Sequence, residues 1–88
     1  MYQLEFLPAA LSALARLDKA VAQRILTKLR WLAEHFDAAK QESLSGHLAG
    51  LLKLRVGDYR IIYEADRERR LLTVHLVGHR SDIYESRA

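Results

Sequence analysis

The chain has 88 residues, of which 50% are hydrophobic and 28% charged, a composition typical of a globular domain and unlike that of a disordered chain. The formal net charge of +3 permits an anionic partner and excludes an unselective polycation. The lack of cysteine excludes disulfides and thiolate metal sites, and no apolar run approaches the roughly 20 residues of a membrane helix. We therefore expect one cytoplasmic domain over residues 1–88, with no membrane partner.

The first part of the chain predicts one strand followed by two helices. Tyr2, Leu4 and Phe6 alternate with polar residues, which is the pattern of a half-buried strand. Pro8 suits the first turn of a helix, and Asp18 is a candidate N-cap for a second, longer helix. The apolar residues of that second helix recur at intervals of three and four, at Val21, Ile25, Leu29, Leu32 and Phe36. We expect the two helices to form a hairpin.

The second part of the chain predicts three strands. The stretch that follows the second helix shows no periodicity, and we interpret it as a connector. Two alternating runs, 51–56 and 59–65, are then separated by Gly57 and Asp58, a two-residue spacing typical of a β-hairpin. Residues 71–77 form the last predicted strand. The order βααβββ indicates an α+β domain in which the helical hairpin packs on one face of an antiparallel-type sheet and leaves the other face free.

The register of the predicted hairpin places cations on the free face. A two-residue turn sets Arg55 opposite Arg60 and Lys53 opposite Ile62, so that two guanidinium groups meet across the strands. Such like charges destabilise a hairpin by up to about 1 kcal/mol, whereas an anion bound between them reverses the sign. The planar fork of arginine suits phosphate, and a lysine adds a point charge. The alternative is a solvated face whose long side chains splay into water, and the hairpin alone leaves both interpretations open.

A polar cluster follows the last predicted strand, where His79, Arg80 and Tyr84 lie close together. This cluster belongs to one of two segments that resemble signature blocks of the RelE branch of the RelE/ParE toxin superfamily. The segments are Leu-Lys-Leu-Arg-Val-Gly-Asp-Tyr-Arg-Ile-Ile-Tyr at 52–63 and Val-Gly-His-Arg-Ser-Asp-Ile-Tyr at 77–84. The predicted element order, the chain length and a Leu-Ser-Gly before the second strand also match, so the resemblance covers essentially the whole chain.

The resemblance implies a toxin of a type II toxin-antitoxin system, an endoribonuclease that cleaves messenger RNA on the ribosome and inhibits translation. It also implies a cognate RelB-like antitoxin that wraps the toxin and neutralises it. Carried over by position, Lys53 matches a catalytic lysine, and Tyr84 matches the active-site tyrosine. Arg60 and Arg80 match phosphate-contacting arginines of the catalytic set, and Arg55 matches a basic, RNA-binding position of the same strand as Lys53.

These side chains are of the types that a mechanism of RNA cleavage needs. Attack of a 2′-OH on the adjacent phosphate needs alignment, neutralisation of phosphate charge, removal of one proton and donation of another. Lys53, Arg60 and Arg80 supply positive charge, and Tyr84 beside such cations is a candidate base. Leu51 stands where RelE has a further lysine, which leaves the identity of the general base open. This weak acid/base set makes dependence on the ribosome for positioning physically reasonable.

Histidine contributes little to the predicted site. Adjacent strand residues point to opposite faces, so His79 and Arg80 are not both expected to face the RNA, and His79 is assigned only a minor RNA-binding role. His75 and His79 lie roughly 13 Å apart along a strand, too far for one zinc ion. We therefore expect neither a metal nor a cofactor.

Two alternatives from other functional classes remain open at this stage. A ParE-like toxin poisons DNA gyrase by protein contact and does not need the arginine and tyrosine cluster that this chain carries. A non-catalytic module that binds RNA or the antitoxin is compatible with the substitution at Leu51.

Overall fold

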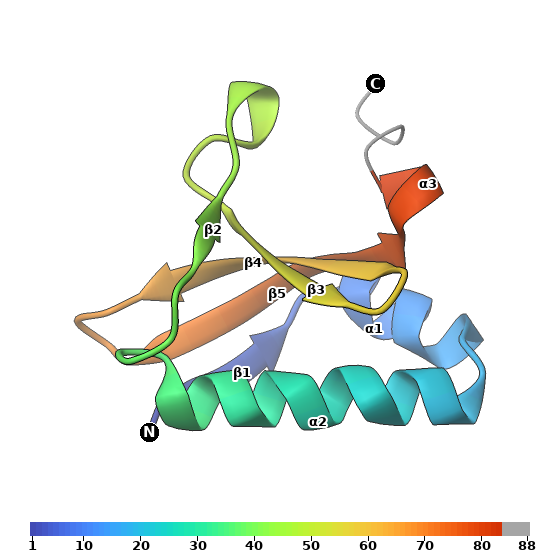
Figure 1. Cartoon of the computed structure of the whole chain (residues 1–88), viewed down its shortest axis with the longest axis horizontal. Coiled ribbons are helices and arrows are strands. Elements are labelled where there is room, and N and C mark those ends of the chain that lie inside the picture. Colours follow the sequence, from blue (N-terminus) through green and yellow to red (C-terminus); the bar gives the residue numbers. More distant parts are fainter. Residues whose placement is uncertain (84–88) are drawn as a thin grey trace.

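A mixed five-stranded sheet with two helices on one face organises the chain (Figure 1). The computed structural model describes residues 1–83. The helices and strands are β1 (Gln3–Phe6), α1 (Pro8–Arg16), α2 (Lys19–His35), β2 (Glu42–Ser43), the 3-10 turn η1 (Gly46–Leu48), β3 (Leu52–Val56), β4 (Tyr59–Asp66), β5 (Leu71–His79) and α3 (Arg80–Ile83). The strands lie in the order β1-β5-β4-β3-β2, with β1 parallel to β5 and every other pair antiparallel.

The predicted N-terminal elements are confirmed. Pro8 lies in the first turn of α1, where its missing N–H costs no hydrogen bond. Asp18 occupies the N-cap position of α2 as predicted, but its side chain makes no capping hydrogen bond, and only its carbonyl accepts from the N–H of Ala22 at 2.9 Å. Both helices lie on the same face of the sheet, α1 against β5 and α2 against β1 and β3 (Figure 1).

The core lies between α2 and the sheet. Ile25 and Leu29 of α2 are fully buried, one turn apart on the side that faces the strands. Just after α2, the ring of Phe36 packs 4.8 Å from Tyr2 and 6.5 Å from Tyr63, measured between centroids. Burial raises the pKa of Tyr63 to about 12, so its phenol stays neutral and acts as a packing group.

The connector contains a strand that the sequence did not predict. In β2, Glu42 pairs with Lys53 and Ser43 with Leu52, so the sheet gains a fifth strand. A two-residue strand is too short to show a periodic pattern, so no alternation of residues along the sequence could indicate it. Figure 1 shows β2 and η1 rising from the sheet on the side away from α2, where α3 also stands.

The hairpin register is confirmed in full. Arg55 pairs with Arg60 and Lys53 with Ile62, as the two-residue turn requires. Gly57, the first central residue of that turn, has a φ of +58°, which is the conformation that a type II′ turn demands there and that side chains disfavour.

Within residues 1–83, none of the helices is long and apolar enough to cross a membrane.

The aromatic contacts of Phe36 predict how much this residue contributes to the free energy of unfolding. Phe36→Ala should lower the free energy of unfolding by about 3 to 5 kcal/mol, because it removes a fully packed ring and leaves a cavity. Urea denaturation followed by far-UV circular dichroism measures this loss. Leu11→Ala, a truncation at a side chain that is 54% exposed, is the matched control and should cost less than about 1 kcal/mol. Equal losses for the two variants would contradict the assignment of the core.

Candidate functional site

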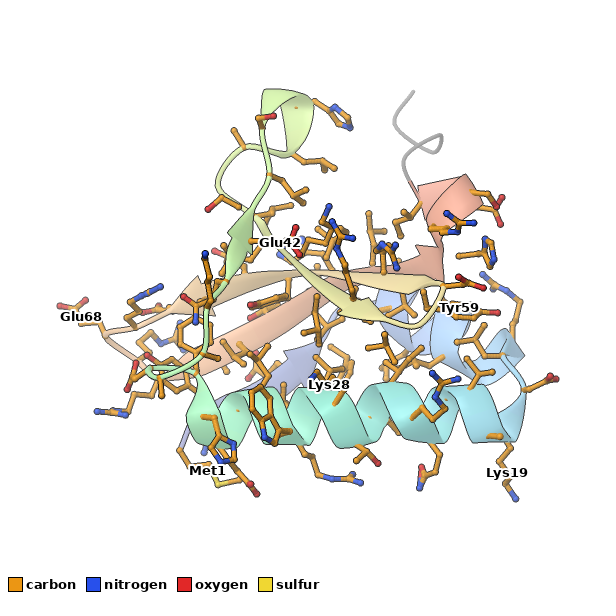
Figure 2. All side chains as sticks on the ribbon, viewed as in Figure 1. Met1, Lys19, Lys28, Glu42, Tyr59 and Glu68 are labelled. Atoms are coloured by element: carbon orange, nitrogen blue, oxygen red, sulfur yellow. The ribbon has the colours of Figure 1, made fainter. Side chains whose placement is uncertain are left out.

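The sheet face away from α1 and α2, which we call the open face, carries the candidate site. Ile61 and Tyr63 of β4 point into the core, so the residues that alternate with them along the strand point to the opposite face. The open face of the hairpin consists of Lys53, Arg55, Arg60, Ile62 and Glu64. Figure 2 shows Glu42 above the sheet on this side, close to nitrogen-bearing side chains.

The opposed arginines of the hairpin turn toward different partners. Arg55 directs its Nε and Nη2 to the two carboxylate oxygens of Glu42, at 3.1 and 3.3 Å. Arg60 donates from Nη1 to the carbonyl oxygens of Gly57 and Tyr59, both at 2.9 Å. Each guanidinium group thus has acceptors of its own, and the predicted backbone register of the two arginines is confirmed. The chain relieves the repulsion with its own acceptors.

Glu42 is a site residue that the sequence did not reveal. Its carboxylate lies 3.7 Å from Nζ of Lys53 as well as on Arg55. The hydrogen bond from Arg55, with the positive charges of Arg55 and Lys53, holds the pKa of Glu42 below its ordinary value. Glu42 therefore stays ionised and lies between two cations of the open face.

Arg80 lies at the turn end of the hairpin. Its backbone N–H donates to the carbonyl oxygen of Asp58 at 2.8 Å, and its Nε lies 3.7 Å from the Asp58 carboxylate. Arg60 donates to Gly57 of the same turn, so the structure brings Arg60 and Arg80 to one end of the open face. Lys53 lies further along β3, and only 16% of its side chain is exposed.

Gly78 allows α3 to fold over the sheet. It pairs with Arg60, and a Cβ atom at this position would lie 3.1 Å from Cδ1 of Ile83, which is itself buried. The missing side chain therefore lets Ile83 anchor α3 directly above β5. The predicted site residue Tyr84 follows Ile83 and lies outside the described residues.

His79 lies apart from Lys53 and Arg60. It pairs with Tyr59, whose ring packs against the core, and the two rings make an edge contact at 5.5 Å. Its Nδ1 lies 2.8 Å from the hydroxyl of Ser81. The structure thus places His79 on the helix side of the sheet.

A second histidine lies on the open face instead. A bulge between β4 and β5 leaves His75 unpaired, and its Nε2 lies 3.1 Å from the carboxylate of Glu64. Bulges re-aim side chains, which a strand pattern in the sequence cannot show. The pair places an imidazole and a carboxylate on the open face. Among residues 1–83, no three His, Cys, Asp or Glu side chains are grouped so that they could hold a metal ion.

Comparison with known proteins shows the family. A protein-family model, described as the ParE toxin of the type II toxin-antitoxin system parDE, matches residues 4–84 of the sequence. The chain belongs to this RelE/ParE toxin family. The toxin is also 32% identical over 87 residues to an Escherichia coli protein named as a RelE-like toxin, a match that covers 94% of this chain and 90% of that protein. The predicted superfamily is thereby confirmed.

Solved structures confirm the predicted fold class of the toxin. It is similar to a chain of the RelBE2 toxin-antitoxin complex of Mycobacterium tuberculosis, with a TM-score of 0.79 and 24% identity, covering 89% of this toxin and 96% of that chain. It is also similar to a chain of the intact Escherichia coli RelBE complex, with a TM-score of 0.72 and 26% identity. That match covers 90% of this toxin and 96% of that chain. Both matches extend over nearly the whole α+β domain.

The ion pair of Glu42 predicts how this toxin responds to pH. Because the folded pKa of Glu42 lies below the ordinary value of 4.5, the pair contributes stability above that value and loses it as the pH falls through the lowered folded value. An NMR titration of the Glu42 side-chain carboxyl carbon should give a midpoint below 4.5. Arg55→Ala should raise that midpoint, because it removes the main cause of the shift. An unchanged midpoint in Arg55→Ala would contradict the observed pairing.

The contact between Gly78 and Ile83 predicts the position of α3. Gly78→Val should displace α3, because the added side chain occupies the space that Ile83 fills. Amide NMR shifts should change mainly at residues 80–83, while those of α2 stay in place. Thr73→Val, on the same strand, is the matched control. If the two variants leave α3 equally undisturbed, Gly78 does not set its position.

Proposed function

We propose that this toxin cleaves messenger RNA on the ribosome and so inhibits translation. The observation that carries the proposal is the gathering of Arg60 and Arg80 at the Gly57–Asp58 turn, with Lys53 on the same face. These cations come from β3, β4 and α3, so the fold itself assembles them. Guanidinium groups at one end of a face match the oxygens of a phosphodiester.

The cations would act on charge and alignment. The 2′ oxygen attacks phosphorus while the bond from phosphorus to the 5′ oxygen breaks, so negative charge on the phosphate oxygens rises in the transition state. Arg60 and Arg80 would donate hydrogen bonds to those oxygens, an interaction that strengthens as the charge develops. The largely buried Lys53 would add a fixed positive charge.

Proton transfer completes the reaction. One proton must leave the 2′-OH and one must reach the departing 5′ oxygen. We propose Tyr84 for the first task, in keeping with its match to the active-site tyrosine of RelE. We propose no proton transfer by His79, because it packs against Tyr59 on the helix side of the sheet, and any RNA contact that it makes would lie outside the open face.

The proposed dependence on the ribosome follows from the absence of a good acid or base among the proposed catalytic residues. Lysine, arginine and tyrosine exchange protons poorly near neutral pH, so the toxin needs a substrate that is already held close to the geometry of attack. A ribosome that grips the messenger supplies that geometry. The partners we propose are therefore the ribosome and its messenger RNA.

We further propose a RelB-like antitoxin as the partner that neutralises the toxin. The similar RelBE chains come from complexes of a toxin with an antitoxin. An antitoxin segment rich in carboxylates would suit the cations of the open face. Covering that face would exclude RNA.

A second candidate function is the poisoning of DNA gyrase, which the ParE description of the family model favours. A gyrase poison acts by protein contact and would not depend on the cations of the open face. Supercoiling assays with purified gyrase separate it from RNA cleavage.

The RNase proposal predicts which variants lose cutting. Arg60→Ala, Arg80→Ala and Tyr84→Phe should each slow messenger cutting on programmed ribosomes by about 100-fold without unfolding the domain, because each removes a group that acts on the transition state. Primer extension maps the new 5′ ends. Arg69→Ala is the matched control, since it removes the same charge from the turn between β4 and β5.

Two outcomes would contradict the RNase proposal. Wild-type toxin that leaves ribosome-bound messenger intact while it blocks gyrase supercoiling would favour the second candidate. Toxin that binds RNA or antitoxin and yet cuts nothing on ribosomes would identify a non-catalytic module.

A further inference from the structure

A carboxylate of the toxin itself lies between two cations of the open face. Glu42 accepts two hydrogen bonds from the Arg55 fork, one on each carboxylate oxygen, at 3.1 and 3.3 Å, and lies 3.7 Å from Nζ of Lys53. A guanidinium binds a phosphate through the same two-pronged arrangement. The space between Arg55 and Lys53 is therefore an anion site, and a carboxylate fills it.

We propose that Glu42 is a specificity-determining residue that competes with RNA phosphate for the site between Lys53 and Arg55 and so weakens the binding of free single-stranded RNA. The inference rests on the proposed function, because that function makes RNA the ligand of the open face. It assigns Glu42 a role in choosing the substrate and none in the bond-breaking step.

The exchange of Glu42 for a phosphate is structurally easy. Side-chain exposures of 49% for Glu42 and 57% for Arg55 put the pair at the surface, where water and salt weaken it. The Glu42 side chain can swing away about its own torsions while the backbone stays paired with Lys53. No rearrangement of the sheet is needed.

Competition by Glu42 favours RNA that is held in place. A phosphodiester brings one negative charge and two free oxygens, much like the carboxylate it must replace, so a single phosphate gains little by entering. A strand fixed along the open face contacts Arg60 and Arg80 at the same time, and those added contacts displace Glu42. A flexible free RNA must also lose conformational freedom, so it binds less well.

Glu64 provides a matched control for this inference. It carries the same charge and lies on the same face, but its carboxylate is 3.1 Å from the imidazole of His75. Glu64→Gln therefore removes one negative charge from the open face without freeing an arginine fork. Glu42→Gln removes the same charge and releases the Arg55 fork from its carboxylate.

Fluorescence anisotropy with a short, unstructured RNA tests the competition. The probe is a labelled single strand with 2′-O-methyl groups, which cannot undergo 2′-OH attack, and the protein is the full-length toxin. Glu42→Gln should bind the probe about fivefold more tightly than wild type at low salt. The slope of log affinity against log salt should steepen by about 0.7, because one more phosphate is neutralised. Glu64→Gln should stay within about twofold of wild type.

The same measurement can overturn the inference. Equal tightening in Glu42→Gln and Glu64→Gln would make the effect one of net charge, and unchanged affinity in Glu42→Gln would refute competition outright. Should Glu42→Gln fold poorly by circular dichroism, Glu42→Asp keeps the charge on a shorter side chain and should tighten binding by a smaller factor; unchanged or weaker binding would again refute it. Wild-type toxin that cuts nothing on ribosomes would refute the proposed function alone, whereas probe bound by no variant would overturn this inference.

Discussion

The register of the hairpin formed by β3 and β4 is the constraint on which the site depends. Side chains alternate between the two faces of a strand, so a slip of one residue would turn Lys53 and Arg55 into the core and expose Leu54. The two-residue turn opposes that slip, because Gly57 adopts a positive φ that the turn requires. Burial of Ile61 against the helices holds the same register from the other side.

The cations of the open face are all held by acceptors of the chain itself. Glu42 holds Lys53 and Arg55, backbone carbonyls hold Arg60, and Asp58 lies beside Arg80. These contacts orient the side chains and leave most of them near water, where an incoming anion can replace the acidic partners. A protein with a formal net charge of only +3 can thus present a concentrated group of cations on one face.

The sequence predicted what local periodicity and turn chemistry control. The two helices, the pairing of β3 with β4 and the opposition of Arg55 and Arg60 along the backbone follow from spacing alone, and the structure confirms them. Contacts between distant segments were beyond such patterns: Glu42 reaches Arg55 from a two-residue strand, and the bulge that turns His75 toward Glu64 leaves no periodic trace. The fold was therefore more predictable than the partners of the site residues.

Removal of the nucleophile tests the proposed chemistry most directly. A messenger with a single 2′-deoxy nucleotide at the mapped cutting position, placed on programmed ribosomes, lacks the 2′-OH that attacks the phosphate. The proposal predicts that the toxin leaves this messenger intact at that bond and still cuts the all-ribose messenger. Cutting of the deoxy-substituted messenger at the same bond and a similar rate would contradict attack by the 2′-OH, and with it the mechanism assigned to the open face.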